Sequence, residues 1–564
     1  MGAPAQITSI HMDLHGKTRR PLLEMCALAL AAGLPAQQQG QQAKGAPDAF
    51  ARYRECIQRL PFTFHTEGRE LVAQTRTLQA LKLLCGDYAD AKQYQEHTRY
   101  TIAALLGKHF DKREFAPALT SLRLLHQKPV DTWLWFHALT IESRHAGTDP
   151  ALALAKQNKN QLQRAAAILA LGEISPSGLA QAIVAVCADF PKKDREGDRN
   201  LLLGALSGAI LANKNKANDE AFRTGLTAYI KLLGDDVGLS HTAKLQIARH
   251  LMATLNGPCL FVNPEPWLEL LARGSVKIPE GGKTVSQPKF FGIESDGERL
   301  CYVLDMSDSM CKEIAPSVRP SGPITGPRKK PIGALPDESD LPWAKIKTRW
   351  DLAREQLKIS LQRLAPEKHF AVVWFGSDSG TLESTPGMVK ATKLNVARVC
   401  EELDGIVCGK PVPQKAPDGV LRGSTNLHSG LRRAFGLSNK GYVESCAYVD
   451  AATLTHGCDT IFLLSDGEPS WDDFHCKDKD YGEGNAIHDA EYGKAAVRTP
   501  EMIYWGPYSR PDWLVQDVER MNAFRRIKIH CIGIGEASTK LLHQLAEVGQ
   551  GQVYTIGKEQ PGGR

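Results

Sequence analysis

Residues 300–310 read Leu-Cys-Tyr-Val-Leu-Asp-Met-Ser-Asp-Ser-Met, an apolar run that passes directly into a cluster of oxygen-bearing side chains. The apolar run is short and nearly continuous, which is typical of a β-strand covered on both faces, and we place this strand at 300–304. Asp305, Ser307 and Ser309 follow it at i, i+2 and i+4. Because Mg²⁺ prefers hard oxygen ligands in octahedral geometry, this spacing indicates a magnesium-type site at the end of the strand.

Two later segments fit the same interpretation. Residues 423–427 read Gly-Ser-Thr-Asn-Leu, a tight turn into a helix that presents the hydroxyl of Thr425. Residues 463–469 read Leu-Leu-Ser-Asp-Gly-Glu-Pro, the end of another strand followed by the carboxylate of Asp466. Open parallel sheets bind ligands beyond the carboxyl ends of their strands, so groups placed at strand ends favour a common site.

The sequence around these segments alternates strands with helices, which predicts an α/β fold with a mostly parallel sheet. The helix that should precede the second strand has Trp350, Leu357 and Leu364 on one face. The expected strands are residues 300–304, 370–375, 460–464, 527–534 and 552–556.

The three motifs, in this order and at this spacing, resemble a von Willebrand factor type A (VWA) domain and its metal-ion-dependent adhesion site. The resemblance covers about residues 290–560, a little under half of the chain. It implies a doubly wound, Rossmann-like α/β domain that holds Mg²⁺ or Mn²⁺ and binds an acidic side chain of a partner protein, which completes the coordination shell. The metal ligands implied by the resemblance are Asp305, Ser307 and Ser309 in the first loop, Thr425 in the second and Asp466 in the third.

The sequence departs from the family's pattern at Asp308, where a glycine is usual between the two serines. We expect its carboxylate to point to solvent. There it would lower the affinity for an acidic ligand or recruit a second cation, so the departure bears on ligand preference.

Two insertions follow metal-loop segments, a proline-rich one at 311–347 and an aromatic-rich one at 470–512, so we expect both at the rim of the site. Aromatic rims are common recognition surfaces. The alternative is that the insertions form a solvated loop and a small satellite core. The residues expected to contact a partner are Asp308, Trp471, Phe474 and Trp505.

Residues 47–273 consist of helix-length amphipathic segments separated by glycine and proline, which predicts an all-α domain. Residues 164–174 resemble one helix of a HEAT-type repeat, in which small side chains let helices pack closely. No strict period is present, so we predict an irregular helical array that acts either as a docking surface or as a spacer. A linker rich in proline and glycine follows at 274–289.

The amino-acid composition excludes several classes of protein. The 564 residues are 42% hydrophobic and 23% charged, which excludes wholesale disorder. The formal net charge of +6 is too small and too dispersed to indicate a nucleic-acid partner. Apolar stretches of about 18 residues or more are missing, so we expect no membrane span in the mature chain.

The N-terminus resembles a secretory signal. Residues 17–20, Lys-Thr-Arg-Arg, precede a mostly apolar run at 21–36 and a glutamine-rich tract at 37–42. We therefore interpret 1–46 as a signal segment and polar tail, and expect export to the periplasm, the cell surface or the medium. The alternatives are a disordered or helical tail and a cytoplasmic protein. In an oxidising compartment Cys400 could pair with Cys408, and Cys446, Cys458 and Cys476 could pair among themselves.

The expected function is Mg²⁺- or Mn²⁺-dependent binding of a protein ligand that offers a carboxylate, without enzymatic activity. One alternative is an adaptor subunit of an ATP-driven chelatase-type assembly, where similar domains occur; it would need a separate motor protein, because the chain has no complete P-loop. The other is a Mg²⁺-dependent phosphoryl hydrolase. That chemistry would want a second carboxylate two residues after Asp305, where Ser307 stands.

Overall fold

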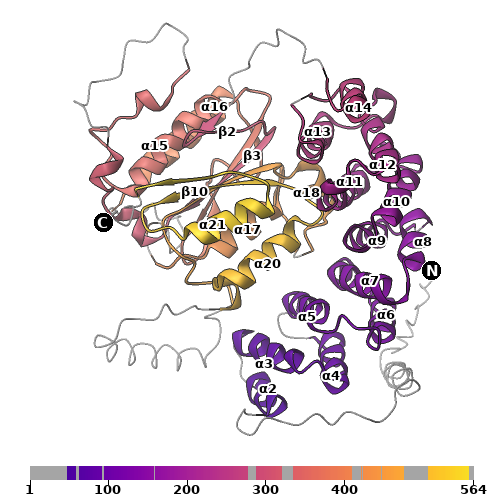
Figure 1. The fold of residues 1–564 in the computed structure, drawn as a ribbon. Helices are drawn as coiled ribbons and strands as arrows, with labels where there is room; N and C mark the ends of the chain where they lie inside the picture. The colour runs from indigo at the N-terminus through magenta and orange to yellow at the C-terminus, as the bar shows by residue number, and fades with distance from the viewer. Residues whose placement is uncertain are drawn as a thin grey trace, which may run out of the picture.

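The computed structural model describes residues 48–557 apart from 59–61, 92–94, 158, 259, 277–287, 320–334, 409–420, 422, 446 and 475–505. A helical region is followed by an α/β region with a mixed sheet, which confirms the predicted order of fold classes (Figure 1). The expected signal segment and tail, 1–46, lie outside the described residues. Within the described part, no helix has both the length and the apolar character needed to cross a membrane.

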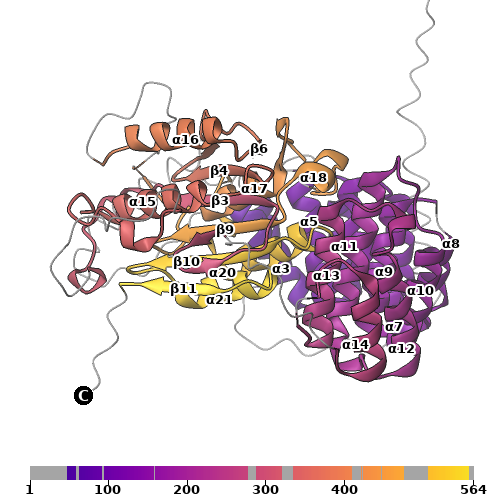
Figure 2. The same cartoon turned by 90° about the horizontal axis from the view of Figure 1, so that it is seen from above.

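The helical region is a crescent of helices in two layers, with its concave side toward the α/β region (Figures 1 and 2). The inner layer contains α3 (Phe62–Gln74), α5 (Gln95–His109), α7 (Thr132–Ala146), α9 (Gln161–Ile174), α11 (Glu196–Ala212) and α13 (His241–Leu255). The outer helices are α4 (Leu78–Ala89), α6 (Ala116–Leu125), α8 (Asp149–Gln157), α10 (Pro176–Ala188), α12 (Glu220–Lys231) and α14 (Pro264–Arg273), and α2 (Ala49–Gln58) packs on α3.

Helix α9 shows why these segments fold as they do. Asn160 caps it by accepting hydrogen bonds from the backbone N–H groups of Leu162 and Gln163. Its residues from Gln163 to Gly172 are all buried, because α7, α8 and α11 pack around it. A Cβ at Gly172 would lie only 2.8 Å from the Cβ of Ala209 in α11. The small side chains at 164–174 therefore allow close helix packing, as the sequence predicted.

The α/β region is built on a sheet with strand order β11-β10-β9-β3-β4-β5, in which β6 also pairs with β4. The five strands from β11 to β4 run parallel and lie where the sequence predicted them, whereas β5 and β6 run antiparallel at the edge. The strands are β3 (Arg299–Asp305), β4 (His369–Phe375), β5 (Ser379–Thr381), β6 (Val389–Lys390), β9 (Thr460–Ser465), β10 (Lys528–Ile534) and β11 (Val553–Ile556). Two short hairpins, β1 (Lys289–Phe290) with β2 (Ile293–Glu294) and β7 (Leu437–Ser438) with β8 (Gly441–Tyr442), lie outside this sheet.

Helices cover both faces of the sheet. Side chains of β3 alternate between two cores, with Tyr302 and Leu304 in one and Cys301 and Val303 in the other. This double burial explains why the run at 300–304 is continuously apolar. The first core includes α15 (Arg349–Gln362) and α16 (Lys393–Gly405), and the second includes α17 (Leu427–Gly436), α20 (Pro511–Asn522) and α21 (Thr539–Val548), while α18 (Ala451–His456) packs against α11.

The turn between α20 and β10 joins the two regions. Ala523 and Phe524 from this turn belong to the hydrophobic core of the helical region. A Cβ at Gly204 of α11 would overlap the carbonyl oxygen of Phe524, so this helix must carry a glycine where the turn enters. The helical region and the α/β region therefore share part of one core.

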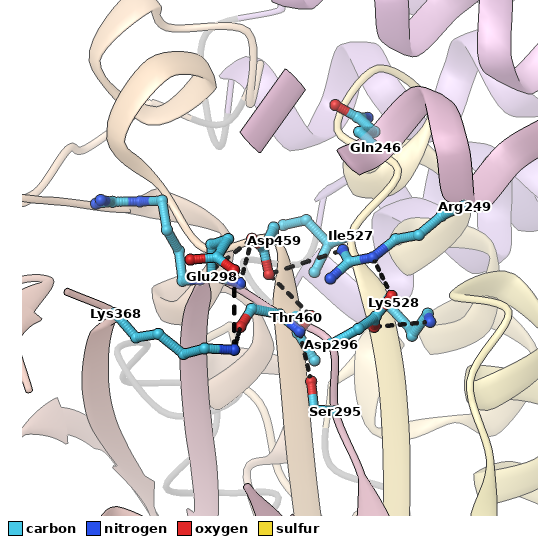
Figure 3. Close-up of polar contacts among 12 residues, drawn as sticks. Gln246, Arg249, Ser295, Asp296, Glu298, Lys368, Asp459, Thr460, Ile527 and Lys528 are labelled. Carbon is cyan, nitrogen blue, oxygen red and sulfur yellow. Dashed lines mark hydrogen bonds and ion pairs between the residues drawn. The ribbon is translucent and has the colours of Figure 1, made fainter. Parts of the chain in front are cut away.

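A network of charged residues reinforces the same interface at the amino ends of the strands (Figure 3). Arg249 of α13 donates to Asp296 at 2.8 Å and lies 3.8 Å from Asp459. Lys528 of β10 also donates to Asp296, at 3.2 Å. Although burial raises the pKa of Asp296, the attraction of Arg249 and Lys528 outweighs it and holds that pKa well below its usual range.

Candidate metal-binding site

The candidate site lies at the carboxyl edge of the sheet, where the adjacent strands β3 and β9 end. The pairing of Leu304 with Leu464 places Asp305 beside Ser465 and Asp466. The hydroxyl of Ser465 donates to Asp305 Oδ2 at 2.9 Å. Two carboxylates that are 161 residues apart in sequence thus lie next to each other, and both are fully buried.

The first loop connects these carboxylates through its serines. The backbone N–H and the hydroxyl of Ser307 both donate to Asp305 Oδ1, at 2.9 Å and 2.6 Å. The hydroxyls of Ser307 and Ser309 are 2.9 Å apart, and Ser309 donates to Asp466 Oδ1 at 2.7 Å. Four of the five expected ligands therefore form one continuous chain of hydrogen-bonded oxygens.

The fifth expected ligand, Thr425, lies on a neighbouring loop, just before α17. This loop is tied to the first by a hydrogen bond from the N–H of Asp308 to the carbonyl of Gly423, at 3.3 Å. It is tied to the third loop by the N–H of Ser470, which donates to the carbonyl of Thr425 at 3.1 Å. Thr425 is buried, and a Cβ added at Gly467 would lie 3.9 Å from its hydroxyl oxygen. The structure thus places Thr425 between the other two loops.

Arg349, which the sequence did not single out, is a further member of the site. Its guanidinium donates to Asp466 Oδ2 at 2.8 Å, and both side chains are less than 10% exposed. A Cβ at Gly535 would lie 2.7 Å from the guanidinium carbon, so the chain after β10 approaches Arg349 closely. One oxygen of Asp466 therefore faces Ser309, and the other is held by a buried cation.

A sequence signal for Arg349 does exist. Thr348 caps α15, which makes Arg349 the first residue of that helix. A cation at a helix N-terminus faces the positive end of the helix dipole, which is unfavourable unless a carboxylate compensates for it. An arginine in this position therefore favours a nearby carboxylate, but the sequence does not identify which one.

The donor set fits Mg²⁺ or Mn²⁺ chemically. It offers carboxylate and hydroxyl oxygens, which are hard ligands of the kind that these cations prefer. Burial first, and the Asp466 carboxylate second, raise the pKa of Asp305 to about 7 against the opposing hydrogen bonds from Ser307 and Ser465. Among the described residues no group of three or more His, Cys, Asp and Glu side chains could hold a metal ion. Any metal held here would therefore depend on the hydroxyl ligands.

The four residues expected to contact a partner have different environments. Asp308 is exposed and Trp471 is half-buried, while Trp505 lies outside the described residues. Phe474 does not fit the expectation, because it is buried and packs 5.1 Å from the ring of Phe62 in α3. Its aromatic ring packs on the helical region instead of facing a partner.

A disulfide begins just after the first loop. It joins Cys311, two residues after Ser309, to Cys408. The anticipated pairing of Cys408 with Cys400 is therefore wrong, because Cys400 is free. Cys458 is also free and buried, whereas Cys446 and Cys476 lie outside the described residues.

Comparisons with known proteins show a distant structural likeness. No family model and no curated protein matches the chain. Among solved structures, the chain is similar to a von Willebrand factor type A protein from Catenulispora acidiphila, with 14% sequence identity and a TM-score of 0.26. The match covers 47% of this chain and 39% of that chain, which is less than half of each.

Proposed function

We propose that this chain is a protein-binding module of the VWA type in which Mg²⁺ or Mn²⁺ captures an acidic group of a partner protein. The metal ligands in this proposal are Asp305, Ser307, Ser309, Thr425 and Asp466. The observation that carries the proposal is the chain of hydrogen-bonded oxygens from Asp305 through the two serines to Asp466. It gathers ligands from separate segments at the edge where parallel sheets bind their ligands.

The residues of the site have distinct roles in this proposal. Asp305 and Asp466 supply negative charge, and Arg349 balances part of it while fixing the orientation of Asp466. The serine and threonine hydroxyls are neutral ligands. A divalent cation held by so little protein charge stays electrophilic and attracts a carboxylate from outside. The exposed carboxylate of Asp308 would repel acidic ligands and thereby tune the choice of partner.

We also propose that the chain is exported and is not an enzyme. The Cys311–Cys408 disulfide supports export, because such bonds persist mainly in oxidising compartments. Ser307 supports a binding role, because it stands where phosphoryl-transfer chemistry would want a second acid.

The first test is calorimetric titration of Mg²⁺ and Mn²⁺ into protein freed of metal with EDTA. We expect saturable binding by the wild type and its loss in Asp305→Asn and in Ser309→Ala. Asp378→Asn is the matched control, because Asp378 is an exposed carboxylate just beyond β4 at the same edge of the sheet. Loss of binding in the control, or undiminished binding in Asp305→Asn, would contradict the site.

The second test asks whether the metal recruits a carboxylate. Peptides that carry aspartate or glutamate would be immobilised beside their asparagine and glutamine isosteres and exposed to the protein with Mg²⁺ or EDTA. We expect retention only on the acidic peptides and only with Mg²⁺. Equal retention on the amide peptides would contradict capture through a carboxylate.

A further inference from the structure

A groove runs along the seam between the helical region and the α/β region. Its first hollow, of about 330 Å³, lies between α3 and α5 on one side and α20 on the other. A second hollow, of about 520 Å³, continues between α7, α9 and α11 and the pair α20 and α21. The two hollows share Val515, Glu519 and Gln544 in their walls, and we call the combined feature the seam groove.

The lining residues of the seam groove on one side come from inner helices of the crescent, whose concave arrangement Figures 1 and 2 show. One wall consists of successive inner helices and the other of α20 and α21. It therefore exists only because the two regions are docked together.

Part of the groove wall is apolar and accessible. Trp133 and Phe136 of α7 stack with ring centroids 5.0 Å apart, and both side chains are only partly buried. Val515 and Val548, on the opposite wall, are also partly buried. Partly exposed aromatic and branched side chains in a hollow are typical anchor points for apolar side chains of a partner.

The rest of the wall is acidic. The carboxylates that line it are Glu70, Glu173, Asp512, Glu519 and Glu547. Among the described residues, the cationic side chains that line it are Lys108 and Arg526, and both have partners. Lys108 lies 3.8 Å from Glu70, and Arg526 donates to the carbonyl of Gly204 at 3.4 Å. The chain as a whole carries a net charge of +6, so the groove is a local exception to the charge of the molecule.

Two of these carboxylates, Glu519 and Glu547, line the same hollow. Burial first, and the negative charge of Glu547 second, raise the pKa of Glu519 above its ordinary value. Like charges held together on the wall of a hollow are relieved when a cation binds between them.

We propose that the seam groove binds a basic amphipathic helix of a partner protein. Apolar side chains on one face of that helix would enter the hollows beside Trp133 and Phe136, and lysine or arginine at its margins would meet Glu519 and Glu547. Helices commonly bind in apolar grooves in this way, and the charge of this groove selects a cationic one. The same charge disfavours nucleic acid. This surface is separate from the metal site, so it does not depend on the proposed metal-dependent function.

The test uses a fluorescein-labelled peptide of about 18 residues, long enough for five helical turns, with leucine on one face and lysine on the other. Fluorescence anisotropy would measure its affinity for the full chain. We expect saturable binding that weakens with salt and is unchanged by EDTA or by Asp305→Asn. A peptide of the same composition with its sequence scrambled, so that it has no apolar face, should bind at least about tenfold more weakly.

Two variants and a matched control locate the binding. The double change Glu519→Lys and Glu547→Lys should weaken binding about tenfold or more, as should Phe136→Ala combined with Trp133→Ala. Glu401→Lys makes one charge change of the same kind on α16, on the opposite face of the sheet, and should alter affinity less than about twofold (Figure 2). Thermal unfolding of each variant would verify that it is folded.

Three outcomes would overturn the proposal: the absence of saturable binding, equal affinity for the scrambled peptide, and equal losses in Glu401→Lys and the groove variants. Analytical ultracentrifugation adds a fourth. A concentration-dependent dimer that disappears in the Glu519→Lys and Glu547→Lys variant would identify a second copy of this chain as the occupant of the groove.

Discussion

Asp466 offers one carboxylate oxygen to Ser309, and Arg349 holds the other, so one buried ion pair orients this side of the candidate metal-binding site. The five expected ligands belong to short motifs at strand ends or just before a helix, whereas no local pattern shows that Arg349 pairs with Asp466, 117 residues away. The same limit applies to Phe474, whose partner Phe62 lies in a different region of the chain. Residues that act through distant partners are therefore the part of the site that sequence motifs leave out.

The ion pair of Arg349 with Asp466 predicts how metal and stability are linked. Arg349→Gln leaves a buried carboxylate without its counter-charge, which should cost about 3 kcal/mol of unfolding free energy in EDTA. Saturating Mg²⁺ should recover part of this loss, because the cation supplies the missing positive charge. Urea unfolding with and without Mg²⁺ would measure both values.

Arg354→Gln is the control for this prediction. Arg354 is also buried and pairs with acidic neighbours on α15, but it has no contact with Asp466. Its stability loss should be the same with and without Mg²⁺. An equally Mg²⁺-independent loss in Arg349→Gln would show that Arg349 has a structural role only.

At the scale of the element, burial on both faces made the parallel strands predictable. Each is a continuous apolar run, and the structure extends the expected strand at 300–304 by only one residue at each end. The edge strands β5 and β6 were not predicted, because they are two or three residues long and carry polar side chains. The Cys311–Cys408 pairing was also missed, since a sequence gives the number of cysteines but not which of them meet.

Two helical glycines test whether the contact between α11 and the turn after α20 requires a glycine. Replacing glycine by alanine inside a helix usually adds about 1 kcal/mol of stability. Gly86 of α4 has open space around it, so Gly86→Ala should give that gain. Gly204→Ala should instead destabilise the protein, because its Cβ would overlap the carbonyl oxygen of Phe524. Thermal unfolding of the two variants would measure the opposite signs, and stabilisation by both would show that the turn after α20 does not need this glycine.

At the scale of the whole molecule, the sequence indicated two regions and their fold classes but not how they dock. Most of the linker expected at 274–289 lies outside the described residues, and the sequence left open that the helical region is an independent spacer. Instead, the turn after α20 enters the helical core, and Arg249 of α13 binds Asp296 in the α/β region. The crescent and the sheet are therefore docked as one unit, and the candidate metal-binding site and the seam groove hold a fixed relation to each other.

This docking makes the molecule sensitive to acid. Burial first, and then the positive charges of Arg526, Arg249 and Lys528, lower the pKa of His250 in α13 to about 3. An unfolded histidine titrates near pH 6.5, so below that pH the unfolded state takes up a proton that the folded state does not. The stability that depends on neutral His250 is thus complete above pH 6.5 and is lost as the pH falls toward 3.

At pH 5 this one group should lower the unfolding free energy by up to about 2 kcal/mol. His250→Gln cannot be protonated, so its unfolding free energy should fall less than that of the wild type between pH 7.5 and pH 5. His543→Gln, at an exposed position of α21, should keep the wild-type pH dependence. Urea unfolding at the two pH values would measure the difference. An unchanged pH dependence in His250→Gln would mean that the acid sensitivity arises from other groups. The prediction depends on three cations near His250, Arg249, Arg526 and Lys528, because they disfavour a fourth positive charge at this interface.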